Sequence, residues 1–112
     1  MNPITTTRPW GSFTRYTLNE SSTVKLINVK QGEQLSLQFH NNREEFWKVI
    51  KGNPEIVIGE ETHIAKEGDE FFVGVTVKHR IGAPVDEVVI LEIAKGEFDE
   101  EDIVRLEDKY NR

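Results

Sequence analysis

Two stretches of alternating residues follow one another in LSLQFHNNREEFWKVIKG, residues 35–52. Apolar and polar residues alternate up to His40, and a second alternation runs from Glu45 to Ile50. A period of two is typical of β-strands, because successive side chains leave opposite faces of a sheet. The polar segment between the two, residues 41–44, predicts a hairpin connection that returns Glu45 to the neighbourhood of His40.

Short β-rich runs of the same kind extend through most of the chain, and turn signals containing Gly or Pro separate most of them. The further runs are 24–29, 55–58, 62–65, 70–73 and 88–94. Many short strands at regular spacing are typical of an antiparallel barrel or sandwich. The sequence therefore predicts an all-β fold.

The C-terminal residues differ from this pattern and predict one short helix. Asp99 is a suitable N-cap, and the acidic residues 100–102 would lie in the first turn, where the helix dipole favours negative charge. Ile103, Leu106 and Tyr110 recur at helical spacing. We expect this helix to cover one end of the barrel.

Composition limits the classes of function. The chain has 112 residues, no cysteine, and 20 acidic against 14 basic side chains, for a net charge of −6. The length predicts a single domain, residues 1–112, and the acidic balance disfavours nucleic acid or an anionic membrane as a partner. Residues 1–10 lack the apolar core of a signal peptide, and no apolar run reaches membrane-spanning length. We therefore expect a cytoplasmic protein.

Four residues could together bind a metal ion. Gln38 and His40 are two positions apart on one expected strand, so their side chains leave the same face. Glu45 begins the next strand, and His79 follows a later one. Two imidazoles, a carboxylate and an amide oxygen can hold a divalent ion such as zinc, manganese, cobalt, nickel or iron. Taken alone, a Gln and a His on one strand are more often polar surface.

The spacing of these residues resembles the two motifs of the cupin superfamily. The first motif corresponds to Gly32, Gln38, His40, Glu45 and Gly52. The second corresponds to Gly68 and His79, with Gly74, Thr76 and Ala83 in place of its usual Pro, second Gly and Asn. This resemblance implies a double-stranded β-helix, the jelly-roll barrel of cupins.

A finer resemblance covers nearly the whole chain in order. Residues 8–12, 32–40, 77–80 and 102–110 are similar to segments of the type II mannose-6-phosphate isomerase domain, in which Gln is normal at the position of Gln38. That domain often follows a sugar-nucleotide pyrophosphorylase domain, whereas here we expect it to stand alone. The resemblance implies a metal site and an isomerase that interconverts mannose 6-phosphate and fructose 6-phosphate through an enediol.

We expect substrate contacts from Arg43, Arg80, Trp47 and Asn42. The two arginines lie beside expected metal ligands in the sequence and are also the catalytic candidates. Asn42 can bond a sugar hydroxyl, and Trp47 either lines the pocket or fills the core. No residue stands out as the general base. The family usually has His in place of Asn41 and Asn42 and at the position of Phe46.

Two other functions stay open at this point. Two His and one carboxylate also suit a non-haem iron oxygenase, and the replaced histidines suit a sugar-binding domain without catalysis.

Apolar residues lie on both faces of the strand that holds Phe46, Trp47 and Ile50. One face needs a cover outside the barrel, which the N-terminal segment, the C-terminal helix or a second subunit could provide. Of these we predict a second subunit, in a C2 homodimer.

Overall fold

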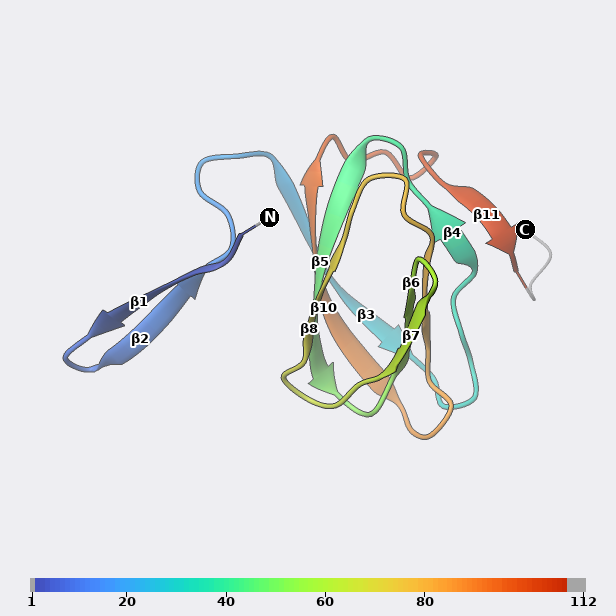
Figure 1. Ribbon diagram of the computed structural model, residues 1–112, viewed down its shortest axis with the longest axis horizontal. Helices are drawn as coiled ribbons and strands as arrows, with labels where there is room; N and C mark the ends of the chain where they lie inside the picture. The colour runs from blue at the N-terminus through green and yellow to red at the C-terminus, as the bar shows by residue number, and fades with distance from the viewer. Residues whose placement is uncertain (1, 109–112) are drawn as a thin grey trace.

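The computed structural model describes residues 2–108, and within this range every regular element is a β-strand (Figure 1). The all-β prediction is confirmed. The strands are β1 (Ile4–Arg8), β2 (Gly11–Arg15), β3 (Ser22–Val29), β4 (Leu37–Phe39), β5 (Arg43–Lys51), β6 (Glu55–Ile58), β7 (Glu61–Ile64), β8 (Glu70–Val73), β9 (His79–Gly82), β10 (Val88–Gly96) and β11 (Val104–Glu107).

Two antiparallel sheets face each other and enclose the core. The four-stranded sheet has the order β3-β10-β5-β8, and the five-stranded sheet has the order β11-β4-β9-β6-β7. Trp47 and Ile90 from the first sheet and Ile56 and Ile81 from the second are at most 1% exposed. The alternation seen in the sequence places these side chains inside, because every second residue of a strand points to the same face.

Two of the connections at which the chain passes from one sheet to the other lie side by side. Residues 40–42 link β4 to β5, and residues 74–78 link β8 to β9. The backbone N–H of Thr76 donates to the carbonyl of His40 at 2.8 Å. The expected hairpin at residues 41–44 is thus a crossing between sheets, although it does return Glu45 to His40.

The C-terminal helix prediction is wrong. Only a local turn forms, in which Asp102 N–H donates to the Asp99 carbonyl at 3.0 Å. The chain then extends as β11 and pairs antiparallel with β4. Pairing with the edge of a sheet satisfies the backbone of this segment and overrides its helical spacing. Tyr110 lies outside the described residues.

An N-terminal hairpin, β1–β2, projects away from the two sheets (Figure 1). Within residues 2–108, sheet pairing joins these two strands only to each other. Trp10, in the turn between them, is 74% exposed and stacks on Phe13 with ring centroids 6.5 Å apart.

No helix in the described part of the chain is long and apolar enough to span a membrane.

Candidate metal centre

Three buried side chains converge between the sheets. The potential ligand atoms of His40, Glu45 and His79 all lie within 4.8 Å of one another. Glu45 Oε1 is 3.2 Å from His79 Nε2 and 3.8 Å from His40 Nε2. Each of the three side chains is 3% exposed, so their polar atoms are removed from bulk water.

The two crossings between sheets explain this convergence. His40 lies in the β4–β5 crossing, and His79 is the first residue of β9, directly after the β8–β9 crossing. Glu45 is the third residue of β5 and pairs with Val73 of β8 on the inner face. Because the crossings are hydrogen-bonded to each other, ligands that are remote in sequence meet at one place.

Backbone carbonyls orient both imidazoles. His40 Nδ1 lies 2.6 Å from the carbonyl of Asp102, and His79 Nδ1 lies 2.9 Å from that of Val77. A carbonyl accepts only, so each Nδ1 carries the proton and each Nε2 keeps a lone pair. Burial lowers the pKa of His40, which favours its neutral form. A neutral His that donates through its second nitrogen is the usual form of a metal ligand.

The centre has unsatisfied polar atoms that a cation would satisfy. Glu45 Oε1 and His79 Nε2 are buried without a hydrogen-bond partner, since their close approach lacks hydrogen-bond geometry. A buried acceptor without a partner costs about 1–3 kcal/mol. A divalent ion bound by both atoms would remove this cost, so the donor set fits a metal.

Gln38 borders the same centre. It pairs with His79 in register across β4 and β9, and cross-strand partners point to the same face. Its Oε1 accepts a hydrogen bond from the Ser36 hydroxyl at 2.8 Å. That oxygen has a second lone pair, which would allow Gln38 to act as a further ligand.

A pocket of about 220 Å³ opens from the centre to the surface. It lies beside the edge strands β3 and β11. Its lining is Lys25, Ile27, Leu35, Gln38, His40, Arg43, Glu45, Glu92, Glu100, Ile103 and Arg105. Mixed apolar and charged walls of this size suit a small polar molecule better than a large one.

Comparison with known proteins places this site in a family. Residues 2–108 match the family described as "Mannose-6-phosphate isomerase C-terminal". The chain belongs to this family. The resemblance seen in the sequence is thereby confirmed for the domain.

Curated relatives of this mannose-6-phosphate isomerase C-terminal domain are much longer proteins. The chain is 37% identical to the xanthan biosynthesis protein XanB of Xanthomonas campestris over 107 residues, with 94% of this chain and 23% of that protein covered. It is 34% identical to the mannose-1-phosphate guanylyltransferase ManC of Salmonella typhimurium, with 94% and 22% covered. The chain thus spans less than a quarter of these relatives.

Solved structures confirm the cupin fold. The capsular polysaccharide assembling protein CapF of Staphylococcus aureus aligns with a TM-score of 0.71 at 18% identity, over 95% of this chain and 34% of that one. A putative sugar phosphate isomerase of Acidithiobacillus ferrooxidans aligns with a TM-score of 0.60 at 19% identity, over 68% and 51% of the two chains. At these identities the likeness concerns the fold.

In this family domain, Arg43 is buried beside the three-residue group. Its Nη1 donates to the carbonyl of Asp99 at 3.0 Å, and its Nη2 lies 3.3 Å from His40 Nε2. Its Cζ lies 4.3 Å from the centroid of the Phe98 ring, a cation–π contact. Nε is buried without a hydrogen-bond partner and is 3.7 Å from Glu45. Arg43 therefore presents a fixed positive charge to the pocket.

Glu92 is a pocket residue that the sequence reasoning missed. It is 5% exposed, and its Oε1 accepts a hydrogen bond from Trp47 Nε1 at 3.3 Å. Burial and the neighbouring Glu45 carboxyl raise the pKa of Glu92 to about 8. Burial alone would also raise the pKa of Glu45, but contacts with His79 and Glu92 hold it well below its usual range. The sequence signal that could have identified Glu92 is its position as a single acidic residue within an otherwise apolar strand.

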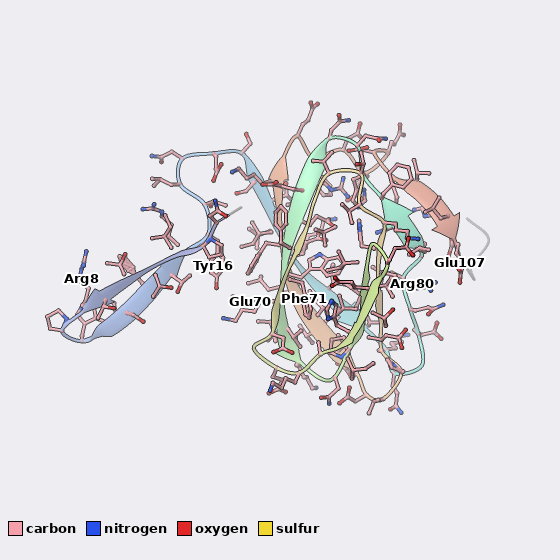
Figure 2. The ribbon with its side chains drawn as sticks, in the orientation of Figure 1. Arg8, Tyr16, Glu70, Phe71, Arg80 and Glu107 are labelled. Atoms are coloured by element: carbon pink, nitrogen blue, oxygen red, sulfur yellow. The ribbon has the colours of Figure 1, made fainter. Side chains whose placement is uncertain are left out.

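Three other expected substrate residues lie outside the pocket lining. Arg80 Nη1 lies 3.0 Å from Glu107 Oε1, and Figure 2 shows these two side chains near each other. As neighbours on β9, Arg80 and His79 point to opposite faces of the sheet. Trp47 is 1% exposed in the core, and its ring packs nearly perpendicular to that of His79, with centroids 5.4 Å apart. Asn42 is exposed, and its N–H donates to Asp102.

The departure at Phe46 concerns another surface of the molecule. Phe46 lies on the outer face of the four-stranded sheet, where the Tyr16 ring packs 4.9 Å from it. This face is opposite to the one that bears Glu45, because the two residues are neighbours on β5. A Phe at this position therefore leaves the pocket unchanged.

Proposed function

We propose that this chain is a metal-dependent sugar-phosphate isomerase that interconverts mannose 6-phosphate and fructose 6-phosphate through an enediol. The observation that carries the proposal is the buried His40, Glu45 and His79 group, with unsatisfied atoms, at the inner end of a small pocket. Membership of the mannose-6-phosphate isomerase C-terminal family supports this choice of substrate.

The ion would be held by His40, Glu45 and His79, with Gln38 as a fourth ligand. When bound, a divalent metal supplies Lewis-acid polarisation of the substrate's carbonyl and hydroxyl oxygens. Nitrogen and oxygen donors of this kind suit zinc, manganese, cobalt, nickel or iron.

Arg43 is the positioning group of the proposal. Its guanidinium is held by the Asp99 carbonyl and the Phe98 ring, so it keeps one orientation before substrate arrives. Such preorganised charge lowers the cost of orienting a bound anionic or hydroxylated molecule. The proposed mechanism assigns no role to Arg80, Trp47 or Asn42, because these residues do not line the pocket.

Proton transfer is assigned to Glu92. Isomerisation moves a proton from carbon 2 to carbon 1 of the aldose, and one hydroxyl proton passes from oxygen 2 to oxygen 1. Glu92 is a buried carboxyl of the pocket that is not needed as a ligand in the proposed set. The Trp47 N–H fixes one of its oxygens, so the other faces a defined direction.

A coupled assay that converts mannose 6-phosphate to fructose 6-phosphate tests this function. We expect turnover that disappears with a chelator and returns when a divalent ion is added. Binding of sugar phosphate without turnover would contradict catalysis and favour a sugar-binding cupin. Iron that supports oxygen consumption would favour an oxygenase instead, since two His and one carboxylate also suit non-haem iron.

The proposed active form is a C2 homodimer. Val24, Ile93, Phe46 and Phe72 are in register across the outer face of the four-stranded sheet. Val24 and Phe72, at its two edges, are 62% and 46% exposed. Ile93 and Phe46, at its centre, are 7% and 5% exposed, so the exposed apolar surface of this face lies at its two edges. Exposed apolar side chains gathered on one face are typical of an interaction surface.

A second copy of the chain is the occupant that we propose for this face. The same chain carries an exposed apolar hairpin, and a two-stranded hairpin is marginally stable without packing. The large apolar side chains that are 44–74% exposed on the hairpin and the outer face are Ile4, Trp10, Phe13, Val24, Leu26, Ile50 and Phe72. A second copy that packs against both surfaces would remove these side chains from water.

A further inference from the structure

Two cations stand at the rim of the pocket, one on the edge strand of each sheet. Lys25 lies on β3 and Arg105 on β11, and both line the pocket. Lys25 pairs in register with Glu92, and Arg105 pairs with Gln38. Cross-strand partners point to the same face, so both cations face the same space as these two polar residues.

Lys25 and Arg105, the rim cations, lie closer to the solvent than the candidate metal centre of His40, Glu45 and His79. The Lys25 side chain is 35% exposed and Arg105 is exposed, whereas His40 and Glu45 are 3% exposed. The pocket therefore has an inner end with metal-ligating atoms and an outer end with positive charge. A ligand that fits this arrangement has oxygens at one end and an anionic group at the other.

Local contacts leave the rim charges available. Lys25 Nζ is 3.5 Å from Glu100, whose side chain is 79% exposed and can turn away. Lys25 Nζ also lies 4.2 Å from the centroid of the Phe98 ring, which contacts Arg43 as well. The Phe98 ring thus holds the ends of two cations near each other, and a third cation, Arg105, lines the same pocket.

We propose that Lys25 and Arg105 form the subsite for the phosphate group of the substrate. A phosphate monoester carries a charge of about −1.5 to −2 and three strong acceptor oxygens. An arginine can donate two parallel hydrogen bonds to it, and a lysine adds a compact charge. The inference rests on the proposed function, since it assigns the phosphate of a sugar phosphate to the rim while the reacting carbons lie near the metal group.

Calorimetric titration with a hexitol 6-phosphate, which has no carbonyl and cannot be isomerised, tests the subsite. The titration uses the purified metal-loaded protein and is repeated with inorganic phosphate and in the presence of a chelator. We expect Lys25→Ala and Arg105→Ala each to weaken hexitol 6-phosphate binding by about tenfold or more, because each removes a charge-assisted hydrogen bond. The loss should persist with chelator, because it does not depend on the metal.

Lys78 provides a matched control. Its side chain has a similar exposure to that of Lys25, 37% against 35%, and it also pairs with a largely exposed glutamate, Glu60, but it does not line the pocket. Lys78→Ala should bind the hexitol phosphate within about twofold of the unmodified chain. The conservative variants Lys25→Arg and Arg105→Lys should retain part of the affinity, which a loss of folding would not.

The outcomes separate this inference from the proposed function. Phosphate binding that depends on Lys25 and Arg105 in a protein without isomerase activity would keep the subsite and reject the isomerase. Isomerase activity with a KM for mannose 6-phosphate that neither substitution changes would reject the subsite. Failure of the unmodified chain to bind the hexitol 6-phosphate, or binding unchanged in both alanine variants, would also overturn it.

Discussion

Glu92 illustrates how a single residue acquires a role only through its neighbours in space. On β10 it follows Leu91 in an otherwise apolar run, yet its side chain enters the pocket between Trp47 and Glu45. The carboxyl is far from bulk water, where an ionised group is costly unless it is paired. Its position therefore favours a chemical role over a structural one.

The Glu92→Gln variant tests that role. Gln keeps the size of the side chain and can still accept from Trp47, but it cannot transfer a proton. We expect kcat for sugar-phosphate isomerisation to fall by about 10²–10⁴-fold, with metal content unchanged. Activity close to that of the unmodified chain would contradict the assignment.

At the residue scale, the sequence predicted the metal group better than the rest of the pocket. The sequence allowed a prediction of His40, Glu45 and His79, because each lies at the spacing of a known motif. Lys25 and Arg105 were not, because their approach depends on which strands pair and in which register. An alternation of period two in the sequence predicts which face of a sheet a side chain lies on. It does not identify the residue's partner on the neighbouring strand.

At the scale of elements, the segment after β10 holds the candidate metal centre in place. The Asp102 carboxylate accepts the N–H groups of both Asn41 and Asn42, at 2.9 Å each. The Asp102 carbonyl faces His40 Nδ1 at 2.6 Å. One residue thus holds the β4–β5 crossing and orients a ligand imidazole.

The Asp102→Ala variant should therefore weaken metal binding without removing a ligand. The substitution keeps the backbone carbonyl that faces His40 Nδ1 but removes the carboxylate that anchors the β4–β5 crossing. Loss of groups around a metal site typically costs about 10–100-fold in metal affinity, and we expect a loss at the lower end of this range, about tenfold, in a competition titration against a chelator. Glu101→Ala, a neighbouring exposed acidic residue, is the control and should bind metal normally. Equal affinities in both variants would show that the Asp102 carboxylate does not act on the metal site.

The turn between β5 and β6 depends on the absence of a side chain at Gly52. This glycine has φ near 87°, and a Cβ there would lie 2.3 Å from the carbonyl oxygen of Glu87. Gly68 has a similar φ of 90° but open space around it. Gly52→Ala should lower the free energy of unfolding more than Gly68→Ala, by about 1–3 kcal/mol. Thermal unfolding of the two variants measures the difference, and equal losses would contradict the steric argument.

Strand prediction succeeded where local pattern and tertiary pairing agree. Residues 55–58 and 70–73 were predicted as strands and coincide with β6 and β8. The C-terminal strand β11 was mistaken for a helix because its helical spacing is a local property, whereas its partner β4 lies more than sixty residues earlier. The hairpin β1–β2 was also missed, since its strands have no buried face to create an alternation.

At the scale of the whole molecule, the proposed second copy of the chain would account for both the projecting hairpin and the outer sheet face. Leu26→Asp places a charge on that face, where Leu26 is 63% exposed. Ile64 is 70% exposed on β7 of the other sheet and provides a matched control. Light scattering at micromolar concentration should show a dimer for the unmodified chain and for Ile64→Asp, and a monomer for Leu26→Asp, because a buried unpaired charge is costly. A monomeric unmodified chain would contradict the proposal.

The central claim is that imidazoles and a carboxylate from separate strands share one cation. Metal content of protein purified without added metal, measured by elemental mass spectrometry, tests it most directly. We predict about one divalent ion per chain, lost in His40→Ala and in His79→Ala but retained in His63→Ala, whose imidazole lies outside the group beside Glu61. Unchanged metal content in the His40 and His79 variants would contradict the account.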